Sequence, residues 1–242
     1  MSENTTMLLE ICVDDISGLK TAIAGGADRI ELCSALSIGG LTPSAGLIAA
    51  AAELPVPSYA MIRPRAGSFI YSADELDVMK RDIDACRDAG LPGVVFGASL
   101  PDGRLDFDTL SALVEHSGSL GKTLHRAFDL VPDIAEAIEM AVSLGFERIL
   151  TSGGAKTGAE GVAVLEQAIT LAASRLSIMP GAGVSLATVG QLWPRLPISE
   201  IHSSGAVTVT ESDERLVDLG FSTPSARHTD AATVKALKAY FA

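Results

Sequence analysis

The segment from Lys122 to Asp129 concentrates groups that perform acid–base and ionic chemistry. It begins as an apolar, strand-like run and then supplies His125, Arg126 and Asp129 within five positions. An imidazole between a carboxylate and a guanidinium can be tuned for proton transfer near neutral pH. The spacing predicts that His125 is an acid or base oriented by Asp129, beside an arginine that binds an anion. The alternative is a buried histidine with a purely structural hydrogen bond.

Polar groups also end other strand-like runs. Glu10 and Cys12 form one Glu-x-Cys pair, and Glu31 and Cys33 form another. Side chains alternate along a strand, so the two members of each pair share a face. Buried carboxylates need partners, and Arg63 is the expected one. A structural Glu–Arg network that stiffens the fold is the alternative to a reactive pocket. The predicted catalytic set is Glu10, Glu31, Arg63, His125, Arg126, Asp129 and His202.

The two strand-end cysteines raise the question of a metal site. Thiolates are soft ligands that suit a cuprous ion, and neighbouring strands lie only about 4.8 Å apart. Cys12 and Cys33 could therefore share one ion. Free cysteine is also among the most buried residue types, so plain packing is the alternative.

Two glycine-containing turns follow the later strands and precede helical segments. Backbone N–H groups in such turns can bind an anion, and TIM barrels often hold phosphate near their last strands. A tight turn without a ligand would need the same glycines. The predicted anion site comprises Ser152, Gly153, Gly154, Gly181, Gly183 and Ser203.

Strand-like and helical segments alternate along the chain. The expected strands are residues 8–12, 29–33, 58–63, 93–96, 122–128, 148–151, 177–179 and 200–203. A helical pattern ends at Gly25 and Gly26, and further helices are expected at residues 72–89, 106–116, 133–144, 161–174 and 185–192. Eight strands separated by helices predict an α/β protein with the (β/α)8 TIM-barrel fold. The alternative is a doubly wound open sheet, but no Gly-x-Gly-x-x-Gly turn follows the first strand.

The chain is expected to form a single domain over residues 1–242, with the barrel at about 8–206. Residues 207–230 are polar with little periodicity, and they are expected to form a mobile arm or long loop. A closing helix is predicted from Ala231 to Phe241, with Thr229 or Asp230 as its N-cap.

The composition limits the classes of partner. A formal charge of −12 without any basic run argues against nucleic acid. Three cysteines do not make a disulfide framework, the N-terminus lacks a signal-peptide pattern, and there is no long apolar run to span a membrane. We therefore expect a cytoplasmic protein. A homo-oligomer is compatible with the sequence.

The motifs that contain these residues resemble the CutC family between about Leu8 and Ala206. They are LEICVD at 9–14, GGADRIELCS at 25–34, GGLTPS at 39–44, MIRPR at 61–65, FIYS at 69–72, VFG at 95–97, HRAFD at 125–129, GFERILTSG at 145–153 and MPGAG at 179–183. The resemblance implies a single TIM barrel and a role in copper homeostasis. It also implies that Cys12 and Cys33 are the cuprous ligands.

Two functions follow from the sequence. The first is copper handling, with Cu(I) bound by Cys12 and Cys33. The second is an enzyme that acts on a small phosphorylated or carboxylated metabolite. Arg63 and Arg126 would bind the anion, and histidine and glutamate would transfer protons. Isomerisation, aldol chemistry and hydrolysis all fit this second function.

Overall fold

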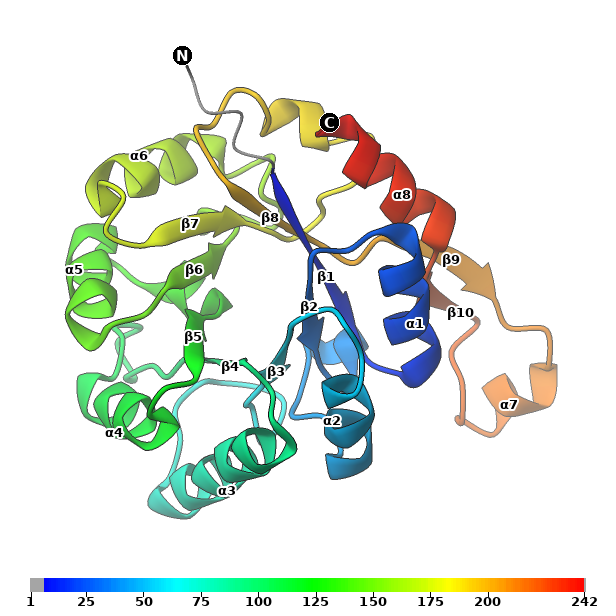
Figure 1. Cartoon of the computed structure of the whole chain (residues 1–242), viewed down its shortest axis with the longest axis horizontal. Helices are drawn as coiled ribbons and strands as arrows, with labels where there is room; N and C mark the ends of the chain where they lie inside the picture. Colours follow the sequence, from blue (N-terminus) through cyan, green and yellow to red (C-terminus); the bar gives the residue numbers. More distant parts are fainter. Residues whose placement is uncertain (1–6, 242) are drawn as a thin grey trace.

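Eight short apolar runs form one parallel sheet in the computed structural model, which describes residues 7–241. The strands are β1 Leu8–Val13, β2 Arg29–Leu32, β3 Ser58–Met61, β4 Gly93–Phe96, β5 Gly121–Leu124, β6 Arg148–Thr151, β7 Ser177–Pro180 and β8 Glu200–Ser203. Their order is β7-β6-β5-β4-β3-β2-β1-β8, and β7 lies against β8, so the sheet curves into a barrel (Figure 1). The predicted TIM-barrel fold is confirmed.

Helices surround this barrel (Figure 1). They are α1 Ile16–Gly25, α2 Ala45–Ala52, α3 Ala73–Ala89, α4 Phe107–Ser117, α5 Ile134–Leu144, α6 Val162–Ala172 and α8 Ala231–Tyr240. Local capping chemistry sets their ends. The Ser72 side chain accepts the Glu75 N–H in a capping box, and Gly90 and Gly145 adopt left-handed conformations just after their helices. The helices predicted at 72–89 and 133–144 end just before these glycines, but the sequence analysis missed α2.

The two faces of each strand have different environments. Leu9, Ile11, Ile30 and Leu32 belong to the apolar core between the strands and the helices. The intervening Glu and Cys side chains of β1 and β2 therefore face the barrel interior, as the period-two alternation predicts.

The N-terminal end of the barrel is closed by a charge network. Arg29, the first residue of β2, pairs with Glu10 and with Glu200, the first residue of β8. Arg148, the first residue of β6, also pairs with Glu200, with 3.0 Å between Nε and Oε2. Both guanidinium groups lie over the ring of Tyr59, at 5.5 and 5.0 Å. The predicted Glu–Arg network thus forms through Arg29 and not through Arg63.

Two element boundaries differ from the prediction. Strand β5 ends at Leu124, because the His125 side chain accepts the Ala127 N–H and begins the 3-10 turn Arg126–Leu130. The helix expected at 185–192 is only a 3-10 turn, Val189–Gln191. The Thr188 hydroxyl there accepts the Ser185 N–H and donates to the Gly183 carbonyl, which competes with helical hydrogen bonding.

The segment after the barrel, predicted as a mobile arm or long loop, is an arm with secondary structure of its own. Strands β9 Ala206–Thr210 and β10 Ser225–Thr229 pair antiparallel, with helix α7 Glu214–Asp218 between them. The arm projects from the barrel beside α1 (Figure 1). The alternating β-branched run of β9 carries the strand signal that the sequence analysis missed. Helix α8 follows with the predicted Asp230 cap and packs against α1.

Candidate functional site

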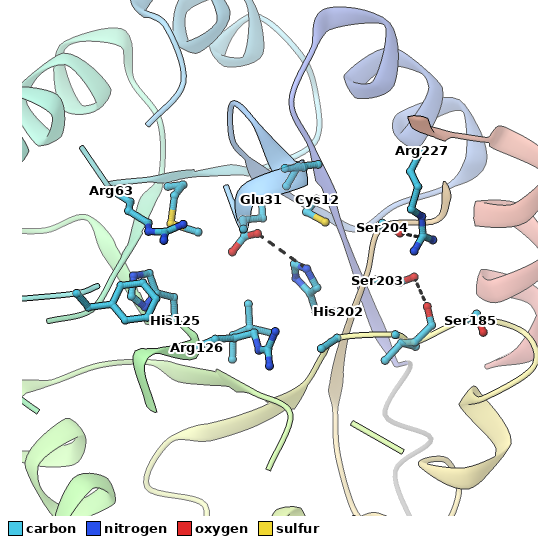
Figure 2. A pocket seen from close by; sticks show the side chains of 18 residues that line it. Cys12, Glu31, Arg63, His125, Arg126, Ser185, His202, Ser203, Ser204 and Arg227 are labelled. Carbon is cyan, nitrogen blue, oxygen red and sulfur yellow. Dashed lines mark hydrogen bonds and ion pairs between the residues drawn. The ribbon is translucent and has the colours of Figure 1, made fainter. Parts of the chain in front are cut away.

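A pocket of about 470 Å³ lies at the C-terminal ends of the strands (Figure 2). It is the end where TIM barrels carry their functional groups. The predicted residues that line it are Cys12, Glu31, Arg63, His125, Arg126, Gly183, His202 and Ser203. Arg227 of β10 lines it as well, and the sequence analysis missed this residue.

Three lining residues bring potential metal ligands together. One donor atom each from Cys12, Glu31 and His202 lies within 4.8 Å of the others, and all three residues are buried. The strand register explains this convergence. Cys12 is the Cα partner of Glu31 across β1 and β2, while His202 is on β8, the other neighbour of β1. The cluster is therefore built by the closure of the barrel around β1.

His202 is held in a fixed orientation by Glu10. Its Nδ1 lies 2.8 Å from Glu10 Oε1, and Glu10 also pairs with Arg29. Its Nε2 lies 3.9 Å from Glu31 Oε2. Metal-binding histidines commonly have one ring nitrogen on a carboxylate and the other on the ion. Glu10 is thus a supporting partner behind the pocket.

These contacts perturb the ionisation of both groups. Burial raises the pKa of the Glu10 carboxyl, but its hydrogen bond to His202 and the charge of Arg29 outweigh burial and lower it to about 2. Burial lowers the pKa of the His202 imidazole, but its interactions with Cys12, Glu31 and Glu10 outweigh burial and raise the pKa well above its ordinary value. The ligand-free cluster therefore favours a protonated His202.

Glu31 keeps one oxygen without a protein partner. Within residues 7–241, its buried Oε1 accepts no hydrogen bond, while Oε2 lies 3.6 Å from the Cys33 thiol. Burial raises the pKa of this carboxyl. Leaving a buried carboxylate oxygen without a partner costs free energy. A cation or a hydrogen-bond donor bound to Glu31 Oε1 would remove this cost.

Cys33 lies outside the pocket lining. It is fully buried with Met61 and Val95, and a Cβ on Gly40 would come within 3.0 Å of its sulfur. Burial, together with the nearby Glu31, raises the pKa of the Cys33 thiol well above its ordinary value. Only Cys12 of the predicted cysteine pair lines the cavity.

Arg63 holds loops together and contacts no carboxylate. Its Nη1 donates to the carbonyls of Ile38 (3.0 Å) and Gly40 (3.1 Å), and its Nη2 donates to Gly67 O (2.9 Å). Within residues 7–241 it forms no ion pair, and its buried Nε has no acceptor. The prediction that Arg63 pairs with the buried glutamates is wrong, because Arg29 occupies that position in the barrel.

His125 is a buried neutral imidazole. Burial lowers its pKa to about 3. The Nδ1 atom accepts the Ala127 N–H, so the proton lies on Nε2, which has no partner in the described chain. The ring packs 4.7 Å from that of Phe69 and occupies space above Gly97, where a Cβ would lie 2.5 Å from Nδ1. His125 can therefore donate a hydrogen bond into the site without carrying charge.

Asp129 fills the turn that was predicted to bind an anion. Its carboxylate accepts the N–H groups of Ser152 (3.0 Å) and Gly154 (3.1 Å) and pairs with Arg126 Nε at 2.7 Å. The Gly153 N–H donates to Thr151 Oγ1. The predicted orientation of His125 by Asp129 is not observed, since these contacts direct the carboxylate to the loop after β6.

The turn after β7 is used differently. The Gly181 N–H donates to Thr151 O, while Gly183 lines the pocket. The Ser203 hydroxyl donates to Val184 O at 2.7 Å and fixes this turn against β8. Nearby, Arg227 donates to Ser204 Oγ at 3.1 Å, which holds the arm's guanidinium at the pocket edge (Figure 2).

Known proteins resemble this chain along most of its length. CutC family proteins from Sinorhizobium medicae and Rhizobium meliloti are 61% and 63% identical, over 96% of this chain in both cases and 95% and 94% of the relatives. A crystal structure from Streptococcus agalactiae, of a CutC protein whose name refers to copper homeostasis, has a TM-score of 0.78. It is 29% identical and covers 82% of this chain and 98% of its own.

No helix among the described residues is long and apolar enough to cross a membrane.

The sequence match and the barrel fold both point to one family. The model that describes the CutC family matches residues 7–207, which is nearly the whole barrel. The chain belongs to the CutC family.

Proposed function

We propose that this protein binds a metal ion at the barrel mouth through Cys12, Glu31 and His202, and that copper(I) is the ion it handles. The convergence of these three donor atoms within 4.8 Å carries the proposal. The unpartnered Glu31 Oε1 and the anchoring of His202 by Glu10 support it independently.

The donor chemistry fits a soft or borderline ion. Thiolate selects Cu(I), and imidazole suits copper as well as zinc. Glu31 supplies negative charge and is the hardest of the three ligands. The copper-related name of the Streptococcus agalactiae relative supports Cu(I) over other ions.

The pair of Cys12 and Cys33, which the family resemblance implies, is a different ligand set that shares Cys12. Cys33 lies behind the Glu31 carboxylate at 3.6 Å. Cys33 is not a member of the group of donor atoms that lie within 4.8 Å of one another. The geometry therefore favours Glu31 and His202 as the companions of Cys12.

An anaerobic Cu(I) titration against a competing chelator tests this choice. We expect Cys12→Ser and His202→Asn to weaken binding by more than the roughly 10–100-fold typical of losing an outer-shell partner. Cys33→Ser is the matched control and should bind nearly as the native protein does. Equal losses in both cysteine variants would favour the cysteine pair. Binding that is indifferent to Cys12 would exclude the proposed site.

A further inference from the structure

The pocket is far larger than a metal ion requires. Its volume of about 470 Å³ lies within the range of roughly 300–1,000 Å³ typical of sites for small organic molecules. Cys12, Glu31 and His202 occupy only part of the lining. The remaining space is available to an organic ligand.

The charge of the lining is opposite to that of the protein as a whole. Arg63, Arg126 and Arg227 line the pocket, and Glu31 is the one carboxylate among its described lining residues, while Asp129 pairs with Arg126 from outside the lining. The complete chain has a formal charge of −12. A cleft lined by positive charge raises the local concentration of small anions, even in a protein that is acidic as a whole.

One buried donor atom of Arg63 and one of His125 lack an acceptor within residues 7–241. Arg63 is 5% exposed, forms no ion pair within residues 7–241 and keeps an unpartnered Nε. The Nε2 of His125, which is 3% exposed, is also unpartnered. A buried charge without a counter-charge is costly. Ligand oxygens near Arg63 and His125 would satisfy both groups.

A second set of open donors lies between the ends of β7 and β8. In the described chain, the backbone N–H groups of Ala182, Gly183 and Val184 donate to no protein acceptor, and all three residues line the pocket. Arg227 lines the same pocket, where its guanidinium donates to Ser204 Oγ and to Ala206 O (Figure 2). The loops after strands seven and eight are where TIM barrels commonly bind phosphate.

We propose that this pocket binds a small phosphorylated metabolite. Its phosphate group contacts the N–H groups of residues 182–184 and the guanidinium of Arg227. Its oxygen-bearing remainder extends towards Arg63 and His125. This ligand is additional to the metal ion, and its binding does not require the metal.

The test is titration calorimetry on the metal-free, full-length protein with glycerol 3-phosphate, inorganic phosphate, malate and glycerol as probes. We expect glycerol 3-phosphate to bind more tightly than inorganic phosphate, and malate and glycerol to bind weakly or not at all. Arg227→Gln should weaken binding of the ester by roughly 10–100-fold, which corresponds to one charge-assisted contact of about 1.5–3 kcal/mol. Arg227→Lys keeps the positive charge and should therefore retain part of the affinity for glycerol 3-phosphate.

The matched control is Arg215→Gln, which removes the same charge from an exposed position in α7 of the same arm. It should bind the ester as the native protein does. The proposal is overturned if neither phosphate compound binds, if malate binds more tightly than the ester, or if Arg227→Gln binds normally. Because the metal is absent throughout, a failed copper titration leaves this result intact, and the reverse also holds.

Discussion

His202 is fixed by its neighbours before any ligand is present. Arg29 holds Glu10, and Glu10 accepts a hydrogen bond from His202 Nδ1 at 2.8 Å. These contacts set the direction of the ring and keep a proton on Nδ1, so that Nε2 is the nitrogen that would give up its proton to an ion. The metal-binding capacity of the site therefore depends on a residue that the ion would not touch.

Replacing Glu10 by Gln should lower metal affinity by about 10–100-fold, because the imidazole loses the charge that supports its orientation and basicity. A competition titration would measure the change, with Glu139→Gln as a control that removes an exposed carboxylate paired with Arg175. A circular-dichroism melt must accompany it, because Arg29 would keep only Glu200 as a buried counter-charge, and breaking a buried ion pair can cost about 3–5 kcal/mol. Unchanged affinity in a folded Glu10→Gln protein would contradict the supporting role.

His125 should make the metal-free protein less stable in acid. Its pKa is about 3 in the folded protein against an ordinary value of 6.5, so the unfolded chain binds the additional proton first. The stability that neutral His125 contributes to the folded protein is fully present above pH 6.5. As the pH falls from 6.5 towards 3, the free energy of unfolding decreases by at most about 1.4 kcal/mol per pH unit.

Urea unfolding at several pH values would measure this loss. His125→Gln should lose less stability than the native protein as the pH falls, while His228→Gln, at an exposed position in β10, should follow the native curve. Parallel curves for the native and His125→Gln proteins would show that the imidazole is not buried in its neutral form.

At the scale of elements, two strands begin with glycine so that another strand can place a large side chain across the barrel. Gly93 and Gly121 start β4 and β5; a Cβ on Gly93 would meet the Tyr59 ring, and a Cβ on Gly121 would meet the Tyr59 hydroxyl and the Glu147 carboxylate. Glycine weakens a strand in general but allows this close approach. The ring in turn lies under the guanidinium groups of Arg29 and Arg148. The N-terminal end of the barrel, called the barrel floor below, is thus filled by the Tyr59 side chain, which packs against the glycines and the two arginines.

Gly93→Ala should destabilise the protein by roughly 1–3 kcal/mol or more through overpacking, because the new Cβ would lie 2.6 Å from Tyr59 Cζ. Chemical denaturation would measure the change in the free energy of unfolding. Gly46→Ala is the matched control, since its Cβ meets nothing closer than 4.0 Å in helix α2 and should be neutral or stabilising. Equal stability of both variants would contradict the packing of the floor.

At the scale of the whole molecule, the arm is an insertion whose ends meet. The Asp230 N–H donates to Gly205 O at 2.9 Å, so α8 returns to the barrel at the point where β9 leaves it. The arm exposes large apolar side chains, including Leu219 (66%) and Phe221 (79%). Helix α8 instead packs on α1, where Lys238 pairs with Asp28 at 2.6 Å. The barrel core therefore does not depend on the arm.

Replacing residues 207–228 by a two-glycine turn should leave a barrel that unfolds cooperatively and still binds the metal, because the backbone contact between Gly205 and Asp230 remains. Binding of glycerol 3-phosphate should weaken as it does in Arg227→Gln, since the same guanidinium is lost. Calorimetric melting and the two titrations would measure these properties. An unfolded product would show that the arm contributes to the core.

The sequence by itself determined the features that depend on local pattern. The alternation of apolar runs with helical segments predicted the barrel, and the period of two along β1 and β2 placed Glu10 and Cys12 on the inner face. Gly26 marked a helix end because few other residues adopt its positive φ. These inferences succeed because each depends on neighbours within a few positions.

Only the tertiary structure decided which charged groups meet. Glu10 and His202 are 192 positions apart and become neighbours because β8 closes against β1. The same closure assigns the buried glutamates to Arg29 and leaves Arg63 without a carboxylate, while Asp129 fills the loop after β6. Ion pairing depends on distances across the barrel, which local sequence patterns do not encode. The sequence therefore shows which reactive groups are present, and the closure of the barrel determines which of them become partners.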